Sequence, residues 1–91
     1  MTPLSGFCDY VQDGDTFKFR HGTWVRLARV DTPELGTEEG ERAKSLLSYK
    51  ILNKDALYDI TATGYYGRPL VEVWVDGINV NDYMISLGWG C

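Results

Sequence analysis

The chain has 91 residues, which is enough for one compact domain with one hydrophobic core. That length excludes a TIM barrel and a complete dinucleotide-binding fold. Nine lysines and arginines against thirteen aspartates and glutamates give a net charge of −4, which argues against binding of nucleic acid through a broad basic surface. Apolar residues make up 44% of the chain and charged residues 24%, a composition typical of a folded protein. We therefore expect residues 1–91 to form a single domain.

No segment of the sequence predicts insertion into a membrane. The apolar stretches near residues 70–75 are interrupted by Glu72 and Asp76 and fall far short of the ~20 apolar residues of a membrane helix. Residues 1–4 lack a charged region followed by an apolar one, so we expect no signal peptide. A mature secreted chain would look the same, so the compartment stays open.

The first third of the chain predicts three strands joined by short turns. We expect these strands at residues 6–12, 16–20 and 23–30, with a turn at 13–15. His21-Gly22 makes a two-residue hairpin connection between the second and third strands. Alternation places Val25 and Leu27 on one face of the third strand and Arg26 on the other. Pro33 lies beyond its end.

The rest of the chain predicts two helices around a second pair of strands. Thr37 is a suitable N-cap for a helix over residues 37–53, and Ala43, Leu46, Leu47 and Ile51 recur on one face. Further elements are expected at residues 56–63 (strand), 64–67 (loop), 70–75 (strand), 76–77 (turn) and 80–87 (short helix), with Gly88 just after the last helix. The order βββ-α-ββ-α is that of a five-stranded Greek-key OB-fold barrel, a mainly β, α+β fold.

The two cysteines, Cys8 and Cys91, lie near opposite ends of the chain. Together with the one histidine, His21, they are too few for a four-ligand zinc site. They either form a disulfide that ties the termini or remain two unrelated thiols, because spacing alone does not fix pairing.

Two carboxylates are predicted to meet at one end of the hairpin. Asp15 precedes the second strand and Asp31 follows the third, so both lie away from the turn at His21-Gly22. Together with the chain leaving the sheet at Asp31-Thr32, they could supply oxygen ligands to a hard divalent cation. Glu34 would stand beside such an ion, and Arg26 would add a positive charge from the same hairpin.

Taken singly, these features have ordinary structural explanations. Asp13-Gly14-Asp15 is common turn chemistry, and residues 31–34 fit an Asx turn with a strand-ending proline. The pattern is not an EF-hand, since no glycine stands at the sixth loop position. The joint occurrence of the features is what indicates a site.

At these residues the sequence resembles the staphylococcal nuclease (thermonuclease) family. The family's signature matches Asp13-Gly14-Asp15-Thr16, then Arg26 followed after three residues by Val30-Asp31-Thr32-Pro33-Glu34. Its second signature matches Tyr66-Gly67-Arg68, and residues 80–88 are similar to its second helix. Several separated motifs in the right order make the resemblance specific over nearly the whole chain.

The resemblance implies a role for each matching residue. Asp15, Asp31 and the main-chain carbonyl of Thr32 would bind a catalytic Ca²⁺. Glu34 would position or deprotonate the attacking water. Arg26 and Arg68 would bind the scissile phosphate. Tyr66 would donate a hydrogen bond to a neighbouring phosphate.

Some features depart from the family pattern. Only Leu35-Gly36 separates Glu34 from the helix, where the best-known member has a long lysine-rich loop, and the family's C-terminal third helix and its two substrate-stacking tyrosines have no counterpart. Tyr10 or Tyr65 would replace the stacking face, or else serve as packing material. A second copy of the chain is hypothesised to cover the side of the barrel left without the third helix, forming a homodimer.

The leading functional hypothesis is a calcium-dependent phosphodiesterase that cleaves DNA and RNA with low sequence specificity. The resemblance implies products with 3′-phosphate and 5′-hydroxyl ends. The alternative is a non-catalytic module on the same fold that binds nucleic acid or protein, and a third hypothesis is a fragment that folds but cleaves poorly. Neither Arg29 nor His21 has a catalytic role predicted from the sequence.

Overall fold

The computed structural model describes residues 4–64 and 67–90, so Tyr65, Tyr66 and Cys91 lie outside the described residues. Its strands are β1 (Leu4–Val11), β2 (Thr16–Phe19), β3 (Trp24–Leu27), β4 (Asp55–Thr63), β5 (Pro69–Val75) and β6 (Ile78–Asn79). The helices are α1 (Glu38–Ile51) and α2 (Val80–Met84), and α2 continues into a π-helical turn, η2 (Ile85–Trp89). No helix in these ranges is long and apolar enough to cross a membrane.

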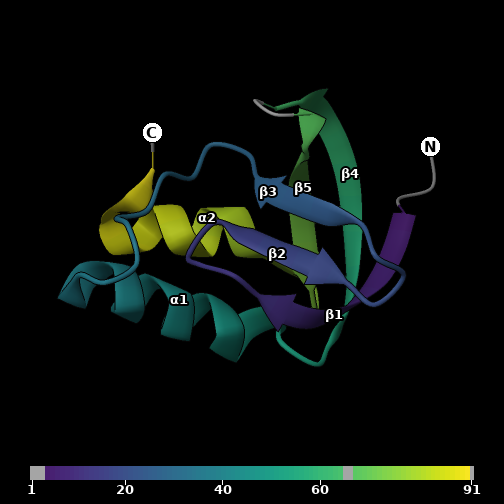
Figure 1. Ribbon diagram of the computed structural model, residues 1–91. Helices are drawn as coiled ribbons and strands as arrows, with labels where there is room; N and C mark the ends of the chain where they lie inside the picture. The colour runs from purple at the N-terminus through teal and green to yellow at the C-terminus, as the bar shows by residue number, and fades with distance from the viewer. Residues whose placement is uncertain (1–3, 65–66, 91) are drawn as a thin grey trace.

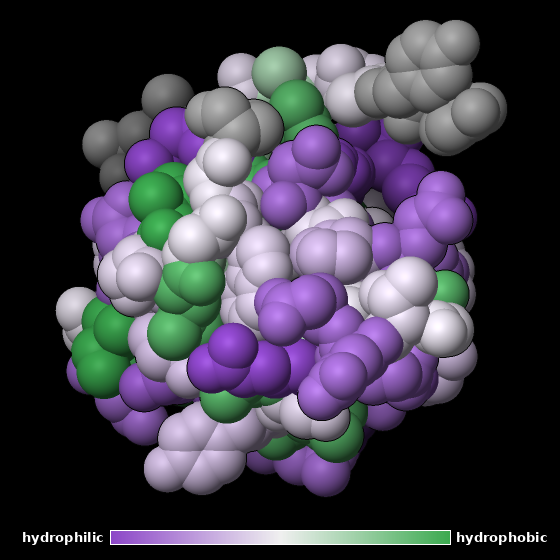
Figure 2. Space-filling model, turned by 90° about the vertical axis from the view of Figure 1, so that its left-hand side faces the viewer, coloured by the Kyte–Doolittle hydropathy of each residue, from purple (hydrophilic) through white to green (hydrophobic). Residues whose placement is uncertain are grey.

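The strands form a closed barrel, which confirms the predicted fold (Figure 1). The first three strands pair in sequence as an antiparallel meander, and β1 also pairs with β4. The parallel pair β3–β5 closes the ring of five strands, while β6 adds two residues at the edge of β5. Both helices pack at one side of the barrel (Figure 1), and the face seen from that side is mostly hydrophilic, with its hydrophobic residues in small separate groups (Figure 2).

The barrel interior explains why these segments form strands. Val25 and Leu27 are fully buried while Arg26 points away from the core, which confirms the predicted alternation. Phe17 and Phe19 on β2 are buried beside them, and their rings meet edge to face at 5.3 Å. Each such side chain contributes on the order of 2 kcal/mol by leaving water.

Helix α1 begins as its sequence predicts. The hydroxyl of Thr37 accepts a hydrogen bond from the amide of Gly40 at 3.0 Å, which satisfies one free amide of the first turn. Ala43, Leu47 and Ile51 are fully buried against the barrel, whereas Leu46, predicted on the same face, is only partly buried. At the other predicted helix end, Gly88 has φ of 103°, the left-handed conformation that ends a helix.

The largest difference from a predicted boundary is at the end of the third strand, while the other ends shift by a residue or two and the two-residue β6 was not predicted. The third strand was expected to run to Val30, but β3 ends at Leu27. Arg29 adopts φ of 65°, which no strand accommodates, and Val30 forms only an isolated bridge with Gly90. The physical reason is the left-handed backbone at Arg29, which turns the chain out of β3, while the Arg29 side chain pairs with partners on β5 and α2.

Cys8 lies in the core of the barrel. Its side chain is fully buried, and burial raises the pKa of the thiol to about 11. The other cysteine, Cys91, is outside the described residues, so the two alternatives for this pair stay open.

Candidate active site

The turn that carries Asp15 is shaped by its two neighbours. The carboxylate of Asp13 accepts a hydrogen bond from the amide of Asp15 at 3.1 Å, an Asx turn that aims Asp15 across the barrel end. A Cβ at Gly14 would lie 2.6 Å from Cβ of Ala43 and 2.8 Å from Oγ1 of Thr32. The absence of a side chain at Gly14 therefore lets the Asp15 turn pack directly on Thr32.

Asp15 is a nearly buried carboxyl group, with 8% of the residue exposed. It accepts hydrogen bonds from the Thr16 hydroxyl at 3.0 Å and from an Arg26 amino group at 3.2 Å. Burial and the adjacent Asp13 carboxylate raise the pKa of Asp15 to about 6, against the opposing effects of Arg26 and Thr16. Arg26 thus compensates the buried negative charge only in part.

Arg26 joins the two carboxylates that the sequence placed at one end of the hairpin. The Arg26 nitrogen that contacts Asp15 also lies 3.8 Å from a carboxylate oxygen of Asp31. Asp31 is the more exposed of the two, and its amide donates a hydrogen bond to the carbonyl of Trp89 at 2.8 Å. The last described turn of the chain therefore anchors the loop that carries Asp31.

Glu34 stands at the start of α1, outside this contact. The Thr37 hydroxyl donates a hydrogen bond to the carbonyl of Glu34 at 2.7 Å, which ties the backbone of Glu34 to the helix cap. Its side chain is exposed and forms no hydrogen bond or ion pair with any described residue. The structure brings Asp15, Asp31 and Arg26 together. The Glu34 carboxylate, three residues after Asp31 in the sequence, has no partner among the described residues.

A cleft of about 510 Å³ opens next to the Arg26 side chain. Its lining combines cations, polar groups and apolar surface, including Gln12, Asp13, Thr16, Arg26, Arg68 and Leu70. The register pairs Arg26 with Leu70, two residues beyond Arg68, so Arg26 reaches the cleft from β3 and Arg68 from the residue just before β5. Tyr66, the remaining predicted phosphate contact, lies outside the described residues.

A second cleft, of about 390 Å³, lies against β1, β4 and β5. Its lining includes Asp55 and Asp76 and, among the described residues, no lysine or arginine. Two carboxylates without a cation repel a phosphate. The cleft beside Arg26 and Arg68 is therefore the one suited to a phosphodiester.

Two contributors to the site were missed at the level of sequence. Asp13 was interpreted as a turn residue, yet it lines the cleft, and hydrogen bonds from Asp15 lower its pKa despite its partial burial. Trp24 carries the guanidinium of Arg68 over its ring, 5.5 Å from the ring centre. Its position two residues before Arg26, on the same face of the strand, was the available signal.

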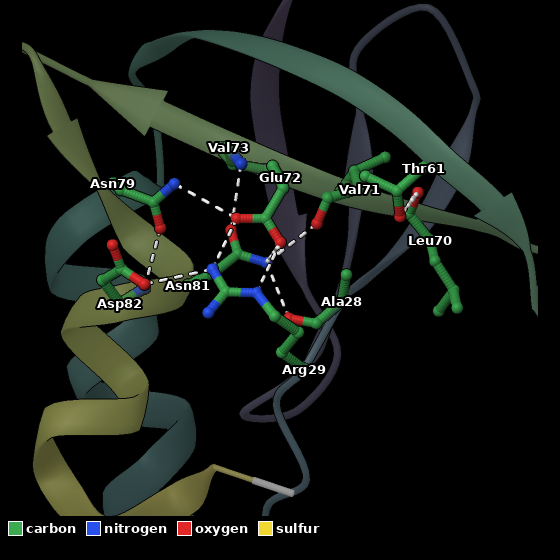
Figure 3. Close-up of polar contacts among 10 residues, drawn as sticks. All are labelled: Ala28, Arg29, Thr61, Leu70, Val71, Glu72, Val73, Asn79, Asn81 and Asp82. Carbon is green, nitrogen blue, oxygen red and sulfur yellow. Dashed lines mark hydrogen bonds and ion pairs between the residues drawn. The ribbon is translucent and has the colours of Figure 1, made fainter.

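Beside the site lies a fully paired polar cluster that fixes its frame (Figure 3). The buried amide of Asn81 donates to the carbonyls of Ala28 and Val71, both at 2.8 Å, and accepts from the amide of Val73 at 2.9 Å. Arg29 binds Glu72 through two nitrogens, at 2.9 and 2.6 Å, and Asp82 at 3.0 Å. These contacts tie the end of β3 to β5 and α2.

The donor set at the site is made of oxygen atoms. Asp15 and Asp31 offer carboxylates and Thr32 offers a carbonyl. These oxygen ligands suit a hard cation such as Ca²⁺ better than they suit softer metals. Among the described residues, no three His, Cys, Asp or Glu side chains are grouped so as to hold a metal ion by themselves. A cation here would need ligands beyond acidic side chains, such as the Thr32 carbonyl and water.

Comparison with known proteins identifies the family. The sequence profile described as "Staphylococcal nuclease homologue" matches residues 24–90. Over 82 residues the chain is 30% identical to an "Uncharacterized endonuclease" of Escherichia coli O157:H7 (86% of this chain, 54% of that protein) and to another from Haemophilus influenzae (86% and 46%). "Protein ParB" of Escherichia coli is 37% identical over 76 residues (80% and 43%). The chain spans about half the length of these relatives. Because the profile covers most of the sequence, including Arg26, Asp31 and Arg68, the chain belongs to the staphylococcal nuclease homologue family.

Proposed function

We propose that this chain is a nuclease that hydrolyses phosphodiester bonds of DNA and RNA with low sequence specificity and depends on Ca²⁺. One observation carries the proposal. Asp15 and Asp31 flank a single nitrogen of Arg26, at 3.2 and 3.8 Å, at the edge of a cleft that Arg68 also lines. Membership of a nuclease family and the endonuclease names of two relatives support it.

The residues fit a hard cation at the carboxylate end of the cleft. Asp15, Asp31 and the Thr32 carbonyl would hold Ca²⁺. When bound, the ion acts as a Lewis acid that stabilises negative charge on the phosphate oxygens. A cation there also compensates the carboxylate charge that Arg26 alone offsets only in part.

The chain's own residues account for the remaining requirements of hydrolysis. Arg26 and Arg68 donate hydrogen bonds to phosphate oxygens, because a planar guanidinium matches phosphate geometry and stays charged. Glu34, exposed and unpaired among the described residues, accepts a proton from water as the water oxygen bonds to phosphorus. The bond from phosphorus to the 5′ oxygen breaks, and that oxygen takes a proton from solvent. The products carry a 3′-phosphate and a 5′-hydroxyl.

Digestion of a plasmid tests the proposal directly. We expect cleavage with Ca²⁺ and none with an excess of chelator. Glu34→Gln should lower the initial rate roughly 10²-fold or more, whereas Glu39→Gln, an exposed glutamate on α1, should cleave like the wild type. End-labelling of the products distinguishes 3′-phosphate from 5′-phosphate ends.

Two outcomes would overturn the proposal in different ways. Absence of calcium-stimulated cleavage, together with retained binding of oligonucleotides, would indicate the non-catalytic module on the same fold. Equal cleavage by the Glu34→Gln and wild-type proteins would remove Glu34 from the mechanism. The homodimer remains a prediction, and a monomeric mass in solution at micromolar concentration would contradict it.

A further inference from the structure

The outer surface of the first three strands carries a row of side chains next to the cleft. Strand register pairs Tyr10 with Lys18 and Lys18 with Trp24, so these three residues lie side by side on one face. The next row on the same face contains Thr16, Arg26 and Leu70, whose side chains line the cleft. The two rows are separated by two residues along β3, about 7 Å.

Tyr10 and Trp24 form an aromatic corner within that row. Their ring centres are 5.8 Å apart and their planes are inclined at 83°, so one ring meets the other edge-on. Tyr10 is 47% exposed, although it lies on a strand in which Cys8 and Val11 are buried. A flat ring can therefore stack on one member of the corner and meet the other with its edge.

Positive charge adjoins this corner. Arg68 places its guanidinium over the Trp24 ring and also lines the cleft, and Arg26 extends from β3 two residues beyond Trp24. The aromatic corner and the phosphate-binding groups are thus contiguous on one surface. Their separation is one that a single nucleotide unit spans between its phosphate and its base.

We propose that the corner of Tyr10 and Trp24 is a subsite that stacks an unpaired nucleobase next to the phosphate bound by Arg26 and Arg68. This inference rests on the proposed function of the cleft. Aromatic stacking accepts any base, since every base has a π face. A base inside a duplex is already stacked on both faces, so the subsite favours single-stranded substrate or a base that has been unpaired.

A pair of oligonucleotides with and without bases tests the subsite without any cleavage. The probes are fluorescent oligothymidylate of eight nucleotides and an abasic oligonucleotide of the same length and charge, measured by anisotropy in chelator at low salt. We expect the wild type to bind the thymidylate about 10-fold more tightly than the abasic probe. Equal affinity for the two probes would overturn the proposal, and this comparison requires no variant.

Variants then locate the effect of the bases. Tyr10→Leu should lower affinity for the thymidylate and leave the abasic affinity within about twofold. Trp24→Phe, which keeps an aromatic ring beside the Arg68 guanidinium, should keep most of the preference. Tyr49→Leu is the matched control, because Tyr49 is 72% exposed beside the cations of Lys50 and Lys54 but lies on α1. A loss of preference in the Tyr49 variant, or its persistence in the Tyr10→Leu variant, would overturn the assignment.

The result is separable from the proposed hydrolysis. A protein that never cleaves but prefers the thymidylate would contradict the nuclease and keep the subsite. A protein that cleaves with calcium but binds both probes equally would support the nuclease and contradict the subsite. A folding defect is recognised by a parallel loss of affinity for the abasic probe, in which case Trp24→Phe and the wild-type comparison decide.

Discussion

Two clusters near the end of β3 have the same composition and opposite geometry. In each, one arginine stands between two carboxylates. Arg29 holds Glu72 and Asp82 at 2.6 to 3.0 Å, while Arg26 lies 3.2 and 3.8 Å from Asp15 and Asp31. The contacts of Arg29 are short and include two parallel bonds to Glu72. The contacts of Arg26 are longer, and its side chain lines a cleft.

The difference separates a structural cluster from one suited to a ligand. Bonds to both carboxylates raise the pKa of Arg29, so its guanidinium stays charged. In the other cluster burial and Asp13 raise the pKa of Asp15, so negative charge remains uncompensated where a cation is proposed to bind. Among the described residues every buried side-chain nitrogen or oxygen has a hydrogen-bond partner. What Asp15 lacks is therefore full compensation of its charge, not a hydrogen bond.

The largest expected effect is on cleavage by the two arginine variants. Arg26→Ala should lower the initial rate of plasmid cleavage roughly 10²-fold or more, because it removes a fixed donor to the phosphate. Arg29→Ala is the matched control and should keep the rate while costing about 1 kcal/mol of unfolding free energy, as expected for a half-exposed ion pair. If the two variants lost activity equally, the distinction between the clusters would fail.

A large effect on stability is expected at the centre of the structural cluster. Asn81→Ala should cost about 3 kcal/mol in urea unfolding, since it removes the Asn81 bonds to the buried carbonyl of Ala28 and the buried amide of Val73. It also removes one of the two bonds to the carbonyl of Val71. Asn79→Ala removes the N-cap bond to the amide of Asp82 and the bond from its amide nitrogen to Glu72 at 3.2 Å, and it should cost about 1 kcal/mol. A loss at Asn81 no greater than that at Asn79 would show that the buried network contributes little.

The cluster of Asp15, Arg26 and Asp31 should make the free energy of unfolding depend on pH. The pKa of Asp15 is higher in the folded protein, about 6, than its ordinary value, so its contribution to stability is present at low pH and is lost as pH rises through about 6. Without calcium, Asp15→Asn should therefore be more stable than the wild type at pH 7–8, by about 1–2 kcal/mol. Urea unfolding at pH 4.5 and 8 measures this difference.

Calcium provides the control for that prediction. Binding to the folded state should stabilise the wild type and leave Asp15→Asn nearly unchanged. Destabilisation by the Asn substitution at pH 8 in chelator would mean that Arg26 fully compensates Asp15.

Sequence reasoning reached the cleft cluster because its geometry is local. Asp15 and Asp31 flank one hairpin, and strand direction alone places them at the same end. The partners of Arg29 lie 43 and 53 residues away along the chain, so no local pattern could pair them. The left-handed backbone of Arg29, which ends β3 at Leu27, has no local sequence signal either, which is why the predicted strand was too long. The contact of Arg68 with Trp24 likewise needed the parallel closure of the barrel.

The smallest expected effect separates the strain at Arg29 from its ion pairs. Arg29 has φ of 65°, a conformation that costs a residue with a side chain roughly 1 kcal/mol and costs glycine little. Arg29→Gly and Arg29→Ala both remove the bonds to Glu72 and Asp82, but only glycine removes the strain. Arg29→Gly should therefore be about 1 kcal/mol more stable than Arg29→Ala in urea unfolding and close to the wild type, with cleavage unchanged in both. Equal stability of the two variants would show that the backbone relaxes once the ion pairs are gone, so that the pairs themselves hold Arg29 in the left-handed conformation that ends β3.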